Sequence, residues 1–140
     1  MRSAITLSFR QEILTGVHDL LSDTVKLALY TSASDVSVST ATYGSATNEV
    51  ATGSGYTAGG VVVASKQIVV DSPAVVFTFA DVEWLLASFT TRYGLLYNST
   101  KANRSIAVFD LLIDRTGTGA TFKLEAPPAT AAAGLVRLIS

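Results

Sequence analysis

Residues 89–111, FTTRYGLLYNSTKANRSIAVFDL, decide the fold class of this chain. Apolar and aromatic side chains recur at alternate positions between Phe89 and Tyr97, which is the spacing of one face of a β-strand. Residues 99–103 are small and polar, as in a turn between strands. Residues 105–112 are apolar on both faces except for Asp110, which is typical of a strand inside a sheet. The stretch therefore predicts a long β-hairpin.

The remainder of the chain predicts further strands and one short helix. Ser8 and Gln11 form a capping box that would start a helix over 9–15, and Gly16 is placed to end it. Strands are predicted over 24–31, 61–70, 74–80 and 120–125. Residues 81–86 are predicted as a short strand or a bend, and residues 135–139 form a last apolar piece. Without any βαβ pattern, residues 1–140 are predicted to form a single all-β domain, a two-sheet, jelly-roll-like sandwich with one short N-terminal helix. Strand spacing alone leaves an immunoglobulin-like sandwich open.

The composition predicts that part of the apolar surface meets protein partners. Hydrophobic residues make up 49% of the chain, charged residues only 15%, and the mean hydropathy is +0.41. A small domain exposes much of its surface, so these values favour covered sheet faces or contacts with other proteins. The net charge of -1, without basic runs, gives no basis for nucleic-acid binding. No membrane span or secretory signal is visible, and we expect synthesis in the cytoplasm.

Three groups of residues that could carry chemistry are better explained by structure. His18 and Asp19 could begin a triad, but no nucleophile motif accompanies them, and a lone histidine near a helix end is usually a capping or packing residue. The glycine-rich residues 53–60 lack the lysine and the helix of a phosphate-binding loop. Asp81 and Glu83 offer too few oxygen ligands for calcium. We therefore expect no enzymatic activity, no catalytic residue, no metal, no cofactor and no small-molecule substrate.

Two segments are irregular but carry spaced apolar side chains. Residues 32–60 form a long loop rich in Ser, Thr, Ala and Gly, and residues 127–140 begin with two prolines as a possible C-terminal arm. Such segments can become ordered on a partner, whereas a packed, featureless connection is an equally good interpretation of the loop. The predicted protein-interface residues are Val36, Val38, Tyr43 and Tyr56 in the loop, and Leu135, Val136, Leu138 and Ile139 near the C-terminus.

Several motifs occur together in a fixed order. They are FRQEILTGVHD at 9–19, KLALYTS at 26–32, NEV at 48–50, GYTAGG at 55–60, Trp84, YGLLYN at 93–98, KANR at 101–104 and AVFD at 107–110. In this order and spacing, the set resembles the capsid cement (decoration) proteins of tailed double-stranded DNA phages. In size and character, the chain is most similar to the jelly-roll cementing proteins of short-tailed phages.

The resemblance implies a structural protein of the virion without an active site. It would bind the outer surface of an assembled capsid and clamp neighbouring major capsid protein subunits against the pressure of packed DNA. It also implies a jelly roll and a homodimer, made in the host cytoplasm, that contacts neither nucleic acid nor membrane. Two alternatives stay open: a head–tail or tail adaptor, and a fibre-associated carbohydrate-binding module that uses Trp84 and the tyrosines as a stacking platform.

Overall fold

The computed structural model describes residues 1–139, so residue 140 of the predicted domain and C-terminal arm lies outside the described part. One α-helix, α1 (Leu7–Leu14), and one 3-10 turn, η1 (Tyr43–Ser45), accompany ten strands in this part. The all-β prediction is confirmed. The strands are β1 (Arg2–Ile5), β2 (Val25–Tyr30), β3 (Val61–Val62), β4 (Gln67–Asp71), β5 (Ala74–Thr78), β6 (Val82–Ala87), β7 (Thr90–Asn98), β8 (Arg104–Thr116), β9 (Ala120–Leu124) and β10 (Val136–Ile139).

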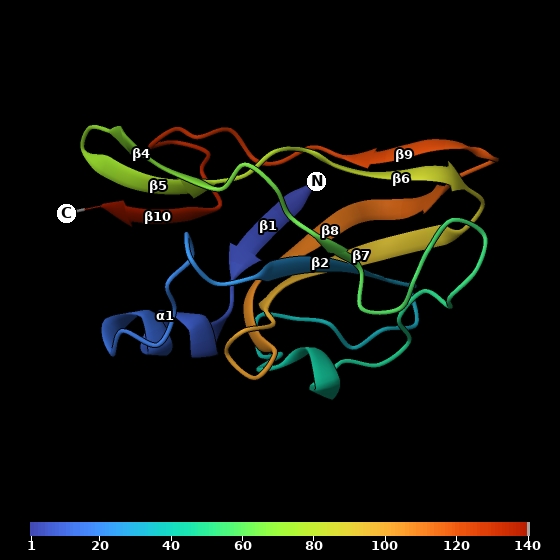
Figure 1. Cartoon of the computed structure of the whole chain (residues 1–140), viewed down its shortest axis with the longest axis horizontal. Coiled ribbons are helices and arrows are strands. Elements are labelled where there is room, and N and C mark those ends of the chain that lie inside the picture. The colour runs from blue at the N-terminus through green and yellow to red at the C-terminus, as the bar shows by residue number, and fades with distance from the viewer. Residues whose placement is uncertain (140) are drawn as a thin grey trace.

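The strands lie in two facing layers (Figure 1). One layer is a five-stranded sheet in the order β1-β8-β7-β2-β3. The other layer holds a three-stranded sheet, β10-β5-β4, and a two-stranded sheet, β6-β9, which follow one another along the long axis. Every strand pair in residues 1–139 is antiparallel. The architecture is an open β-sandwich.

The hairpin predicted from residues 89–111 is present as β7 and β8, inside the five-stranded sheet. Each of these strands has a neighbour on both sides, as the apolar residues of β8 predicted. On β2, Val25, Leu27 and Leu29 are buried in the main core between the layers, also as predicted. Ala28 and Tyr30 are buried as well, on the opposite face of the sheet, because side chains from residues 32–60 pack over them.

The helix begins earlier than the sequence predicted and ends where it predicted. The N-cap is Thr6, two residues before the predicted cap, and its hydroxyl accepts a hydrogen bond from the Phe9 N–H at 3.3 Å. At the other end, Gly16 adopts φ +70 and the Val17 N–H donates to the Glu12 carbonyl at 3.1 Å. This is a Schellman motif, in which a left-handed glycine satisfies the last carbonyls of the helix.

The strand predicted over 61–70 is divided between the two layers. β3 pairs with β2 in the five-stranded sheet, whereas β4 pairs with β5 in the opposite layer. Ser65, with φ +53, lies in the segment that crosses between them. The prediction of one strand is wrong: residues 64–67, ASKQ, interrupt the β-branched run, and the local pattern does not indicate that its two parts join different sheets.

The segment predicted as a C-terminal arm is built into the sandwich. β10 pairs along β5, with Val136 opposite Phe77, and both Leu135 and Val136 are buried in the main core. Gly134 lies so close to β5 that an added Cβ would be 2.4 Å from Val76 Cγ1. The assignment as an arm is therefore corrected. Pairing with β5 provides partners for the backbone N–H and C=O groups of β10, and two apolar side chains of the segment are buried in the core.

Candidate protein-interaction surfaces

Residues 32–60 are held on the sheet by the carboxylate of Glu49. The hydroxyls of Tyr43 and Tyr56 and the N–H of Gly59 each donate a hydrogen bond to it at 2.6 Å. The Tyr97 hydroxyl of β7 donates to the Gly59 carbonyl at 2.7 Å, and the Tyr97 ring stacks on Tyr43 with centroids 4.7 Å apart. Burial and the hydrogen bonds to Glu49 raise the pKa of both Tyr43 and Tyr56 well above the ordinary value. The loop is thus an ordered, packed cover.

The eight predicted interface residues differ in whether they can reach a partner. Tyr56, Leu135 and Val136 are buried, Val36 and Tyr43 are half-buried, and Val38, Leu138 and Ile139 are exposed. The first three pack inside the chain, which corrects their assignment as surface contacts. Tyr56 is only 2% exposed, and its ring lies 5.7 Å from that of Phe89, centroid to centroid. The residue type alone does not indicate from the sequence that Tyr56 is buried.

An exposed apolar face lies on the three-stranded sheet, and of its exposed residues only Leu138 was predicted from the sequence to contact a partner. The register aligns two rows across β4, β5 and β10: Val70, Val75 and Leu138 in one, and Ile68, Phe77 and Val136 in the other. Because Phe77 and Val136 are core residues, this face points toward the interior of the sandwich. The three-stranded sheet projects past the end of the five-stranded sheet (Figure 1), so part of this face has no layer opposite it. The other four side chains of the two rows are therefore exposed, Val70 to 75%. We call Ile68, Val70, Val75 and Leu138 the edge surface.

A second set of exposed apolar side chains lies toward the opposite end of the molecule. Two strand ladders contain a bulge. One shifts the pairing of β6 with β9 between Trp84 and Ala87, and the other shifts the pairing of β7 with β8 near Leu112. Each bulge turns two consecutive apolar side chains out to solvent, on strands whose second halves run to the same end in Figure 1. Two of these residues have positive φ, +51 at Leu86 and +72 at Leu112. We call the end of the molecule that carries these two pairs, Leu85 with Leu86 on β6 and Leu112 with Ile113 on β8, the distal surface.

A groove beside β1 brings together two of the predicted interface residues. Its volume is about 350 Å³, and Val36 and Val38 line it together with Tyr93 and Asp110 of the hairpin. Arg92 pairs with the Asp110 carboxylate: its Nε donates to Asp110 Oδ1 at 2.7 Å, and its guanidinium lies 5.2 Å from the Tyr93 ring centroid. The hydrogen bond from Arg92 lowers the pKa of the Asp110 carboxyl. The groove combines apolar walls with a fixed ion pair.

His18 is a packing residue, as predicted. Its side chain is fully buried, with Nε2 3.3 Å from Glu12 Oε1 and Nδ1 3.1 Å from the Asn98 amide nitrogen. Because that amide nitrogen can only donate, Nδ1 accepts and the ring proton lies on Nε2, which donates to Glu12. The Asp19 carboxylate instead accepts from the Ser22 N–H at 3.2 Å. The geometry is that of a structural network and not of a triad.

The glycine-rich residues 53–60 serve close backbone approach, also as predicted. Gly60 has φ +77, and a Cβ added there would lie 1.9 Å from the Leu27 carbonyl oxygen. Only glycine fits a position that combines a left-handed backbone with so near a neighbouring strand. The segment leads directly into β3 and not into a helix.

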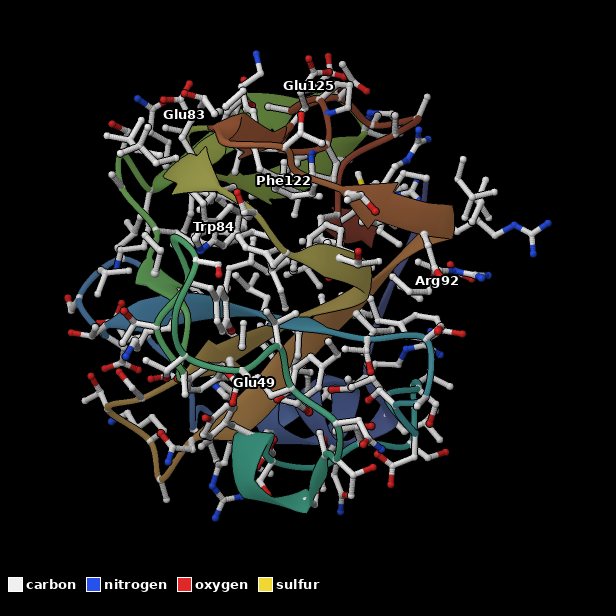
Figure 2. All side chains as sticks on the ribbon, turned by 90° about the vertical axis from the view of Figure 1, so that its right-hand side faces the viewer. Glu49, Glu83, Trp84, Arg92, Phe122 and Glu125 are labelled. Carbon is white, nitrogen blue, oxygen red and sulfur yellow. The ribbon has the colours of Figure 1, made fainter. Side chains whose placement is uncertain are left out.

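Trp84 fills the core between the layers. Figure 2 shows Trp84 and Phe122 inside the sandwich, with ring centroids 5.9 Å apart, while Glu83 and Glu125 point outward. A buried indole ring is not available to stack on a sugar. Asp81 accepts a backbone hydrogen bond from residue 126 at 2.8 Å. Among residues 1–139, no three His, Asp or Glu side chains gather so as to hold a metal ion.

Comparison of the chain with protein families, with curated proteins and with solved structures finds no match in any of the three. Within residues 1–139, α1 is too short and too polar to cross a lipid bilayer. Among the described residues, the features that could meet a partner are the edge surface, the distal surface and the groove.

Proposed function

We propose that this protein is a capsid cement protein of a tailed double-stranded DNA phage. It binds the outer surface of the shell, clamps neighbouring major capsid protein subunits, and so stabilises the shell against internal DNA pressure. It acts as a homodimer in the virion after synthesis in the host cytoplasm, without enzymatic activity, cofactor, or contact with nucleic acid or membrane. The ordered motifs that resemble cement proteins support this proposal, and the surfaces described above give it a physical basis.

The observation that carries the proposal is the separation of two exposed apolar surfaces. The edge surface and the distal surface lie toward opposite ends of the long axis (Figure 1). A protein that joins two others needs separate contact surfaces, and exposed apolar side chains grouped on one surface are a usual mark of such contacts. The two-ended arrangement suits a clamp, whose task is to hold neighbours at a fixed distance.

The backbone of the distal surface supports a contact role. A leucine with positive φ is a steric outlier, and holding one in that conformation costs about 1–3 kcal/mol. Here Leu86 and Leu112 both have this conformation, and both side chains are exposed, so burial within the chain does not offset the cost. Strain of this kind clusters at sites of recognition, where the fixed side chain meets a partner.

We also propose that the β-sandwich has the topology of a jelly roll. The chain passes from one layer to the other after β3, after β6 and again after β8. Repeated crossing between two packed antiparallel sheets supports this assignment, because a jelly roll is a double-sheet fold. Of the alternatives, a head–tail or tail adaptor would share the two-ended arrangement. The carbohydrate-binding module loses its main support because Trp84 is buried.

The test is to count copies of the chain on phage heads. Purified protein is added to DNA-filled heads from a phage that lacks its gene, and the bound copies are quantified after sedimentation. A cement protein binds in proportion to the shell lattice and raises the temperature at which the heads release DNA. Binding limited to a single ring at one vertex would indicate an adaptor, and failure to sediment with the heads would refute the proposal.

A pair of matched variants locates the contact. Leu85→Lys puts a charge on the distal surface, and we expect the protein to fold normally but to lose most of its binding to heads. Val62→Lys is the control, since Val62 is also exposed but lies on β3, outside both surfaces. Equal binding by the two variants would show that the distal surface is not the shell contact.

A further inference from the structure

The outer edge of β4 is unprotected. β4 pairs with β5 on one side only, and in residues 1–139 no backbone hydrogen bond joins its other side to another segment. Its sequence, QIVVD, contains no lysine, arginine or proline, and its ladder with β5 has no bulge. Proteins usually guard a free edge with such features, because unpaired N–H and C=O groups recruit another strand. The exposed apolar side chains of Ile68 and Val70 further favour association at this edge.

The hairpin geometry defines which main-chain groups are free. The turn at residues 72–73 closes on the pair Asp71–Ala74, so Asp71, Val69 and Gln67 direct their N–H and C=O groups toward β5. Ile68 and Val70 lie between these positions and direct theirs away from the sheet. The two exposed apolar side chains of the strand thus belong to the residues with unpaired main-chain groups.

We infer that two copies of this chain associate through β4, in an antiparallel pair about a two-fold axis at Val69. In this register, Ile68 lies opposite Val70 of the second copy, so all four outward-facing residues find main-chain partners. Gln67 lies opposite Asp71 of the second copy, where an amide can donate to a carboxylate. No like charges face each other, so the strand is complementary to itself in both its apolar and its polar positions.

The pairing joins the two three-stranded sheets into one sheet of six strands. Ile68 and Val70 each gain an apolar neighbour across the new ladder, and the two edge surfaces become continuous. The distal surfaces then lie at the two far ends of the assembly, since each points away from its own β4 (Figure 1). The use of this dimer on a shell rests on the proposed function, whereas the pairing itself rests on the geometry of β4.

Cysteine cross-linking tests the inferred register. The chain has no native cysteine, so any disulfide must join the introduced residues. Val69→Cys would place its thiol opposite its own copy in a non-hydrogen-bonded pair, where Cα atoms lie about 4.5 Å apart and a disulfide can close. Mild oxidation should convert most of this variant to a covalent dimer. The control is Arg137→Cys on β10, the other edge of the same sheet; preferential cross-linking there would overturn the inference.

Sedimentation of charged variants tests the pairing without relying on a disulfide. Val70→Lys places two lysines near each other across the two-fold axis and should shift the protein from dimer to monomer with its unfolding temperature little changed. Leu85→Lys carries the same charge at the distal end and should remain a dimer. If Val70→Lys stays dimeric, or if the natural chain is a monomer at micromolar concentration, the inference is wrong. A dimer that fails to bind heads would refute only the proposed function.

Discussion

Replacing Glu49 by alanine should cost the protein a large part of its stability. The substitution removes one acceptor from three donors, two of which, the Tyr56 hydroxyl and the Gly59 N–H, belong to buried residues. A buried donor left without a partner costs about 1–3 kcal/mol, and the half-buried Tyr43 hydroxyl adds less because water can reach it. We therefore expect a loss of about 3–5 kcal/mol, which is large beside the usual 5–15 kcal/mol for a domain.

Urea unfolding and a thermal melt measure this loss. The unfolding temperature should fall by about 10 °C, since each kcal/mol corresponds to roughly 2–4 °C for a chain of this size. Glu83→Ala is the matched control: it removes an exposed carboxylate and should change stability by no more than about 0.5 kcal/mol. If Glu49→Ala is as stable as the control, residues 32–60 are held by packing alone and the role assigned to the carboxylate is wrong.

Three further outcomes follow from single contacts. Gly60→Ala should destabilise the fold by at least about 2 kcal/mol in urea unfolding, because its Cβ would meet the Leu27 carbonyl 1.9 Å away. His18→Ala should cost about 2–4 kcal/mol through the cavity and lost hydrogen bonds, and still leave binding to heads intact. Stability should fall as the pH drops below about 4, because Arg92 lowers the folded-state pKa of Asp110 below its unfolded value of about 3.9.

Each of these outcomes has its own control. Gly44→Ala should be nearly neutral, since an added Cβ there meets nothing within 4 Å; an equal loss at both glycines would remove the steric explanation. A His18→Ala protein that folds and yet cannot protect heads would revive a functional role for that residue. The Asp110 contribution is present above its unfolded pKa and disappears as the pH falls through the folded one, so Asp110→Asn should flatten the acid limb of the stability curve.

The parts of the fold that the sequence predicted are those set by local alternation. β7, β8 and β9 were predicted because apolar side chains recur at every second position. The central place of β8 in its sheet was predicted because it has apolar residues on both faces. Gly16 marked the helix end because a left-handed residue is needed there. Each of these signals is carried by a few neighbouring residues.

The parts that it missed depend on contacts between distant residues. Residues 64–67 interrupt the apolar run of 61–70 without indicating which layer each part joins, and nothing near Leu135 indicates that β10 pairs along β5. The bulges that expose Leu86 and Leu112 depend on pairing with other strands, whereas the local sequence pattern predicts that these leucines are ordinary core residues. The exposed surfaces therefore had to come from the structure, although the excess of apolar residues had predicted that such surfaces exist.

The proposed clamp role requires load to pass between the two contact surfaces. β2, β7 and β8 run side by side through the five-stranded sheet, and β7 and β8 continue toward the distal end (Figure 1). β5, which carries part of the edge surface, is joined through residues 79–81 directly to β6, which carries Leu85 and Leu86, so tension between these two sites passes along the covalent chain. Each contact with a neighbour can then be weak. In the proposed β4-linked dimer, binding of one distal surface would confine the second near its own site, and this effective concentration would raise the overall affinity by about 10²–10⁴ without any new contact.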